Sequence, residues 1–197
     1  MFEVPHLGDA LPLPPSDPRW LEVALTDLDA VHADHLHCER KAAQSALSLI
    51  RSYPDRADLV EAMARLAHDE TRHVVQVARL LARRRQPASY DLGDDYAAKL
   101  RTHIRAREPE RLLDRLLVFA VIEGRSAERL ALLAGALEDE KARELYGSLA
   151  EAEVRHRDTF LSLARDAAPG AWRARAAELA AIEAEILAGR PILPRVH

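Results

Sequence analysis

The chain has 197 residues, of which 48% are hydrophobic and only 5% aromatic, and its formal net charge is −4. This length suits one domain with a sizeable core, and the alanine- and leucine-rich composition favours helices over sheets. The sequence has no apolar run long enough to span a membrane, no secretory signal, and a single cysteine, so we expect a cytoplasmic protein without a membrane partner.

The first part of the chain differs from the rest in its proline content. Residues 1–15 are rich in proline and are expected to form an extended arm, whereas residues 16–190 are expected to form one helical domain. The spacing of apolar residues predicts long helices over about residues 16 to 53, 55 to 85, from Pro109 onward, 138 to 165, and 172 to 188.

These helices predict an all-α fold built on a four-helix bundle. The connection over residues 86–109 is long enough to cross the bundle from end to end, so we expect a long crossover between the second and third helices. The helix over residues 172–188 is extra, and we expect it to cap the bundle.

Four short stretches, one on each helix of the bundle, carry the candidate chemistry. In chain order they read Glu, Glu-x-x-His, Glu, Glu-x-x-His, and their residues are Glu39, Glu70, His73, Glu123, Glu153 and His156. Residues three apart on a helix project from the same side, so each Glu-x-x-His pair offers a carboxylate and an imidazole to one point. The lone glutamate precedes the paired one by 31 residues in the first half and by 30 in the second, which indicates one helix pair used twice.

All six of these residues lie on apolar helix faces, where charged groups are rare unless they are paired or bind a metal. Two divalent cations would balance four carboxylates. Carboxylate and imidazole ligands suit iron and manganese, whereas thiolates would suit zinc better. The pattern therefore predicts a site for two iron ions, with manganese as the alternative, and it is typical of di-metal sites in four-helix bundles.

The neighbours of Glu39 allow several interpretations. His32 and His35 share its helix face, and each could orient a ligand, line a substrate cavity, or pack as an ordinary core histidine. His37 should point away from that face, and Cys38 is interpreted as a packing residue. Candidate acceptors for hydrogen bonds from the ligands are Asp69 and Asp139.

With these residues placed, the chain resembles a known family from about Trp20 to Ala164. The stretches that carry the resemblance are DHLHCERKAA, LAHDETRH, EPERLLDRLLVFAVIE, VIEGRSAERL and LAEAEVRH. They are similar to the tRNA 2-methylthio-isopentenyl-adenosine hydroxylases, often called MiaE, of the ferritin-like di-iron superfamily. The resemblance implies that the six residues hold two irons, and that O₂ and two electrons from an external donor of the reductase or ferredoxin type hydroxylate an isopentenyl side chain next to the anticodon.

The resemblance also implies a tRNA partner, and the charge distribution suggests where it could bind. Residues 79–111 contain nine lysines and arginines against five acids, although the whole chain is acidic. We expect this basic segment, with Arg83, Arg84 and Arg85, to contact the phosphates of the anticodon stem-loop. The alternative function is a ferritin-like oxidase, peroxidase or iron-handling protein with the same metal site.

Overall fold

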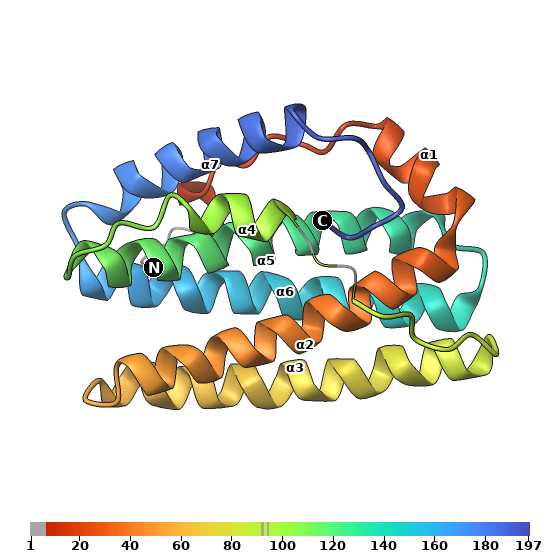
Figure 1. The fold of residues 1–197 in the computed structure, drawn as a ribbon, viewed down its shortest axis with the longest axis horizontal. Coiled ribbons are helices and arrows are strands. Elements are labelled where there is room, and N and C mark those ends of the chain that lie inside the picture. Colours follow the sequence, from red (N-terminus) through yellow and green to blue (C-terminus); the bar gives the residue numbers. More distant parts are fainter. Residues whose placement is uncertain (1–6, 92, 94) are drawn as a thin grey trace, which may run out of the picture.

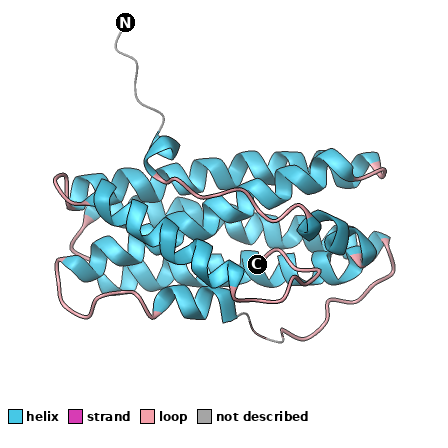
Figure 2. Cartoon of the chain, turned by 90° about the horizontal axis from the view of Figure 1, so that it is seen from above, coloured by secondary structure: helices cyan, strands magenta, loops and turns pink. Residues whose placement is uncertain are grey.

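The computed structural model describes residues 7–91, 93 and 95–197, and these residues form helices and loops without any strand (Figure 2). In chain order the helices are the short 3-10 helix η1 (Leu7–Ala10), α1 (Arg19–Thr26), α2 (Leu28–Ser52), α3 (Ala57–Arg83), α4 (Asp95–Arg101), α5 (Glu110–Ala136), α6 (Glu140–Ala167) and α7 (Trp172–Ala188). The all-α prediction is confirmed. None of the described helices is long and apolar enough to cross a bilayer.

The four long helices form the bundle as two antiparallel hairpins. α2 pairs with α3, α5 pairs with α6, and the hairpins pack on each other (Figure 1). Because α3 and α5 run in the same direction, the chain between them must return along the whole bundle, which confirms the predicted crossover. α4 lies within that crossover. α7 lies lengthwise over α5 and α4, so it covers a side of the bundle and does not cap an end.

Two polar contacts hold the crossover at opposite ends of α2. Arg84 Nε lies 2.6 Å from Asp29 Oδ1 at the start of α2. The hydroxyl of Tyr53, just beyond the end of α2, donates to Glu108 Oε1 at 2.6 Å. At 1.5 Å per residue, the 25 residues of α2 separate these contacts by about 37 Å. The basic segment predicted over residues 79–111 is therefore spread along the length of the bundle.

The prediction of one helix over about residues 16 to 53 is wrong in one respect, because this stretch forms two helices. α1 ends at Thr26, and Asp27 leaves the helical conformation (φ −145°, ψ 74°) before α2 begins. The Asp27 side chain accepts a hydrogen bond from the backbone N–H of Ala30 at 3.0 Å. This bond satisfies one of the free N–H groups at the start of a helix, which is why an aspartate here favours a new helix over a continuous one.

The apolar core consists of two clusters with a polar layer between them. The first contains Leu49, Leu66 and Val121, and the second contains Val31 and Val77, together with many other buried side chains. On each of the four bundle helices, the glutamates and histidines of the predicted site fall between the residues of these two clusters. Burying one aliphatic side chain stabilises a fold by about 1.5–3 kcal/mol, so the clusters can offset the cost of a polar layer.

The N-terminal segment runs along α5. Ser16 donates to Glu128 from both its backbone N–H and its hydroxyl, at 2.7 and 2.8 Å. Residues 1–6 of the predicted arm lie outside the described residues, and the division into an arm over residues 1–15 and a domain over residues 16–190 stays a prediction.

Candidate metal centre

The structure brings the six predicted side chains together as two overlapping groups of metal-ligand type. One group is formed by Glu39, Glu70, His73 and Glu153, and the other by Glu70, Glu123, Glu153 and His156. Within each group, one ligand atom from every residue lies within 4.8 Å of the others, and all of these residues are buried. Glu70 and Glu153, the glutamates of the two Glu-x-x-His pairs, belong to both groups, so each could bridge two cations.

Both histidines direct Nδ1 toward the carboxylates. His73 Nδ1 lies 3.3 Å from Glu39 Oε2 and 3.5 Å from Glu70 Oε2. His156 Nδ1 lies 2.8 Å from Glu70 Oε1 and 3.4 Å from Glu153 Oε2. The two imidazole rings are 5.6 Å apart between centroids. Each Glu-x-x-His pair therefore presents its carboxylate and its imidazole to the same point, as the spacing requires.

Several polar atoms of this cluster have no hydrogen-bond partner among the described residues. They are both carboxylate oxygens of Glu70, both of Glu153, and Nδ1 of His156, whose short contact with Glu70 lacks hydrogen-bond geometry. Leaving a buried polar group unsatisfied costs about 1–3 kcal/mol, and more for a charged group. All of these atoms except His156 Nδ1 belong to the two carboxylates that the groups share, and bound cations would satisfy them. The residues present thus fit a di-metal site.

The electrostatics of the cluster also favour added positive charge. Burial raises the pKa of Glu70, and the nearby charge of Glu39 raises it further. Burial and the charges of Glu153 and Glu70 raise the pKa of Glu123 well above its ordinary value. Burial lowers the pKa of His73, but its contacts with Glu39 and Glu70 outweigh that effect and raise it to about 9. The glutamates and histidines of the cluster therefore hold protons at positions where bound metal cations would balance the negative charge of the carboxylates.

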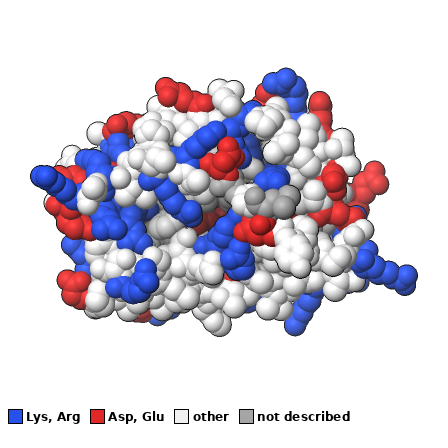
Figure 3. Space-filling model, viewed as in Figure 1, with Lys and Arg blue, Asp and Glu red and all other residues white. Residues whose placement is uncertain are grey.

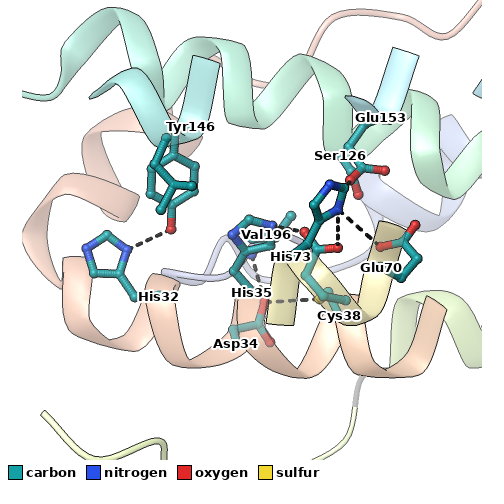
Figure 4. A network of polar contacts seen from close by, with 12 residues as sticks. His32, Asp34, His35, Cys38, Glu70, His73, Ser126, Tyr146, Glu153 and Val196 are labelled. Carbon is teal, nitrogen blue, oxygen red and sulfur yellow. Dashed lines mark hydrogen bonds and ion pairs between the residues drawn. The ribbon is translucent and has the colours of Figure 1, made fainter. Parts of the chain in front are cut away.

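The structure separates the roles of the two histidines near Glu39. His35 Nε2 lies 2.5 Å from Glu39 Oε1, and because an ionised carboxylate only accepts, the imidazole donates this bond. His32 instead contacts the hydroxyl of Tyr146, with its Nδ1 at 2.7 Å (Figure 4). Tyr146 also stacks on His35, with ring centroids 5.3 Å apart. His35 thus orients a candidate ligand, whereas His32 supports the ring beside it.

We predict that His35→Phe weakens metal binding without unfolding the protein. Phenylalanine keeps a ring against Tyr146 but cannot donate to Glu39, and losing such an outer partner of a ligand lowers metal affinity about 10–100-fold. Titration of metal-free protein with Fe(II) under anaerobic conditions measures this affinity. His37→Phe is the matched control, because His37 points away and contacts the backbone oxygen of Ser89 at 2.7 Å. Equal affinities for the two variants would rule out the role of His35.

The other predicted neighbours have mixed outcomes. Asp69 Oδ2 lies 3.9 Å from His156 Nε2, which is too far for a hydrogen bond. Asp139 is not near a ligand; it caps α6 by accepting from the backbone N–H groups of Lys141 and Ala142. Tyr146 was missed, although it precedes Glu153 by seven residues, which is two helical turns and places both on one face.

A cavity of about 220 Å³ reaches this cluster at Glu123. Its wall includes the apolar side chains of Phe119 and Ile122, and also Cys38 and His197. Cys38 thus does more than pack between helices, because it borders a cavity, with its Sγ 3.6 Å from His197 Nδ1. No pattern in the sequence predicted that His197 borders this cavity, because the residues after α7 reach it only by folding back onto the bundle (Figure 1).

A ferritin-like four-helix bundle with a buried, carboxylate-rich cluster suited to two metal ions defines the class of this protein. Residues 9–197 match the family described as tRNA-(MS[2]IO[6]A)-hydroxylase (MiaE). The chain therefore belongs to this family of tRNA hydroxylases.

Two relatives and one solved structure support this assignment. A Pseudomonas putida protein named tRNA 2-(methylsulfanyl)-N(6)-isopentenyladenosine(37) hydroxylase is 42% identical over 188 residues, or 95% of this chain and 91% of the relative. The Salmonella typhimurium protein of the same name is 29% identical over 87% of this chain and 78% of its own length. A solved structure described as protein 43 with aldehyde deformylating oxygenase activity, from Synechococcus, aligns with a TM-score of 0.88 at 37% identity over 93% of both chains.

Proposed function

We propose that this chain is a di-iron monooxygenase that hydroxylates the isopentenyl side chain of 2-(methylsulfanyl)-N6-isopentenyladenosine in tRNA, next to the anticodon. The observation that carries the proposal is the pair of overlapping Glu/His groups that meets a cavity at Glu123, in a chain of the tRNA hydroxylase family. We infer a cytoplasmic site of action, because that is where the tRNA substrate is found.

The proposed ligands are Glu39, Glu70, His73, Glu123, Glu153 and His156. When bound, two irons would supply the redox chemistry by which O₂, two electrons and two protons convert a C–H bond to C–OH and release one water. The four carboxylates would match the charge of the two cations, and the imidazoles would complete the donor set. Manganese could bind the same donors, and metal analysis of the purified protein distinguishes the two.

The cavity wall would position the substrate. Phe119 and Ile122 offer apolar surface for the five-carbon isopentenyl group, and Phe119 packs on Phe160 with ring centroids 5.4 Å apart. With the substrate bound, these side chains would help to exclude water from the space beside Glu123.

The electrons must come from outside this chain. An iron–sulfur cluster needs about four thiolate ligands, whereas the sequence has the single cysteine Cys38. We therefore infer an external donor of the reductase or ferredoxin type.

The proposal is tested with purified, iron-loaded protein, a chemical reductant and tRNA that carries the isopentenyl nucleoside. After nucleoside digestion, mass spectrometry should detect one added oxygen atom, and the reaction run under ¹⁸O₂ should add the heavier isotope. A control with tRNA that lacks the isopentenyl group should show no change. If the nucleosides stay unmodified while the protein rapidly oxidises Fe(II), the oxidase or iron-handling function would replace this proposal.

A further inference from the structure

A second cavity adjoins the one that reaches Glu123. It has a volume of about 380 Å³, and its wall includes Ser48 and Arg115. The two cavities share wall residues, among them Lys41, Arg101 and Phe119. The two cavities therefore lie side by side among residues of α2, α4 and α5, and the inner one borders the candidate metal centre at Glu123.

The rim of this opening carries three basic side chains, which we call the basic rim: Lys41 of α2, Arg101 of α4 and Arg115 of α5. Glu123, beside the metal centre, is the only acid in the wall of either cavity among the described residues. In Figure 3, lysine and arginine side chains gather over the left half of this face. The opening is thus positive although the whole chain is acidic.

Acidic neighbours compensate only part of this rim charge. Lys41 pairs with Asp91, whose Oδ1 lies 3.6 Å from Lys41 Nζ, but this buried Nζ has no hydrogen-bond partner in the described part of the chain. Arg101 forms no ion pair with any described residue. Arg115 donates to the Ser48 hydroxyl at 3.3 Å and lies over the Tyr53 ring, both of which are neutral. Arg101 and Arg115 therefore have no acidic partner among the described residues, and the Lys41 ammonium keeps its hydrogen-bond donors unused.

The expected substrate explains why such charges surround this opening. The nucleotide to be modified lies in a single-stranded loop, where a base can leave the stack and enter a pocket while the backbone stays outside. Phosphates on either side of that nucleotide would then lie at the rim. Lysine and arginine are the side chains that bind phosphate in this way, and such contacts make affinity depend on salt.

We propose that Lys41, Arg101 and Arg115 bind the phosphates of the anticodon loop and hold the modified nucleotide over the cavity that ends at Glu123. This inference rests on the proposed function and adds the residues that recognise the RNA backbone. It replaces the expectation that Arg83, Arg84 and Arg85 do so. Arg84 already pairs with Asp29, which lies 12 residues before Lys41 on α2, or about 18 Å along the helix axis.

The test compares two triple variants with equal loss of charge. The rim variant is Lys41→Gln, Arg101→Gln and Arg115→Gln, and the control variant is Arg83→Gln, Arg84→Gln and Arg85→Gln. Fluorescence anisotropy measures the affinity of each iron-loaded protein for a labelled anticodon stem-loop over a series of salt concentrations. We expect the rim variant to bind about 10-fold more weakly or worse, with a salt slope reduced by about 2–3, and the control variant to bind within about 2-fold of wild type.

The outcomes separate this inference from the proposed function. Unchanged affinity of the rim variant, or an equal loss in both variants, would overturn the basic rim while leaving hydroxylation by the wild-type protein intact. If the wild-type protein neither binds the stem-loop nor hydroxylates the tRNA, the proposed function fails and the rim fails with it. Iron content and melting temperature equal to wild type exclude misfolding as the cause of weaker binding.

Discussion

A Glu70→Gln variant is expected to lose both metal ions and more than about 100-fold of its hydroxylase activity. Glu70 belongs to both ligand groups, and each of its oxygens lacks a hydrogen-bond partner in the described part of the chain. Removing an outer partner of a ligand already costs about 10–100-fold, so the loss of a proposed ligand of both ions is expected to exceed that range. Iron content by elemental analysis, together with the nucleoside assay, measures both effects.

The two kinds of ligand should behave differently. Glu39 and Glu123 each belong to one group only, so Glu39→Gln should weaken one ion more than the other, whereas Glu153→Gln should behave like Glu70→Gln. Glu151→Gln is the matched control, because Glu151 is exposed on the same helix as Glu153 and should leave the iron content unchanged. Two irons retained by Glu70→Gln would contradict the assignment of Glu70 as a shared ligand.

The same substitution should stabilise the metal-free protein. Without cations, Glu70 is a buried carboxyl whose pKa is raised by burial and by Glu39, so a neutral amide removes part of an unfavourable interaction. A higher melting temperature of metal-free Glu70→Gln, together with loss of iron, would show that this residue serves function at a cost in stability.

An Arg125→Met variant is expected to lose about 3–5 kcal/mol of unfolding free energy, although Arg125 lies outside the metal ligands. Arg125 is 1% exposed, and it donates to both carboxylate oxygens of Glu183, at 2.7 and 2.9 Å. It also donates to Glu128 and to the backbone oxygen of Pro14. One guanidinium thus joins α5, α7 and the N-terminal segment, and its removal leaves the fully buried Glu183 without its cation.

Urea unfolding of the metal-free protein measures this loss. Arg65→Met is the control, because Arg65 pairs with Glu61 on the surface, where their side chains are 78% and 67% exposed and such a pair contributes at most about 0.5 kcal/mol. The double variant Arg125→Met with Glu183→Leu should recover much of the stability, since neither member of the buried pair is left without the other. A loss of less than about 1 kcal/mol for Arg125→Met would contradict the structural role of the pair.

The local pattern predicted some features and missed others for clear reasons. The break at Asp27 was missed because the apolar stripe continues through it, and only the capping bond to Ala30 separates α1 from α2. The charge counted over residues 79–111 did not reveal how these residues are placed in space, because Arg84 and Glu108 contact opposite ends of α2. Arg125 was not identified because its partner Glu183 is 58 residues away.

By itself, the sequence determined the helical class, the long crossover and the six residues that come together between the helices. These features follow from two regularities of helices. Positions three or four residues apart share one face of a helix, and an antiparallel partner helix brings later residues back to the same height in the bundle. Spacing along the chain is therefore sufficient to predict them. Only the tertiary structure decided which cavity reaches Glu123, which histidine contacts Glu39, and that Lys41, Arg101 and Arg115 share one rim. Those features depend on how separate helices pack, and no local pattern records that packing.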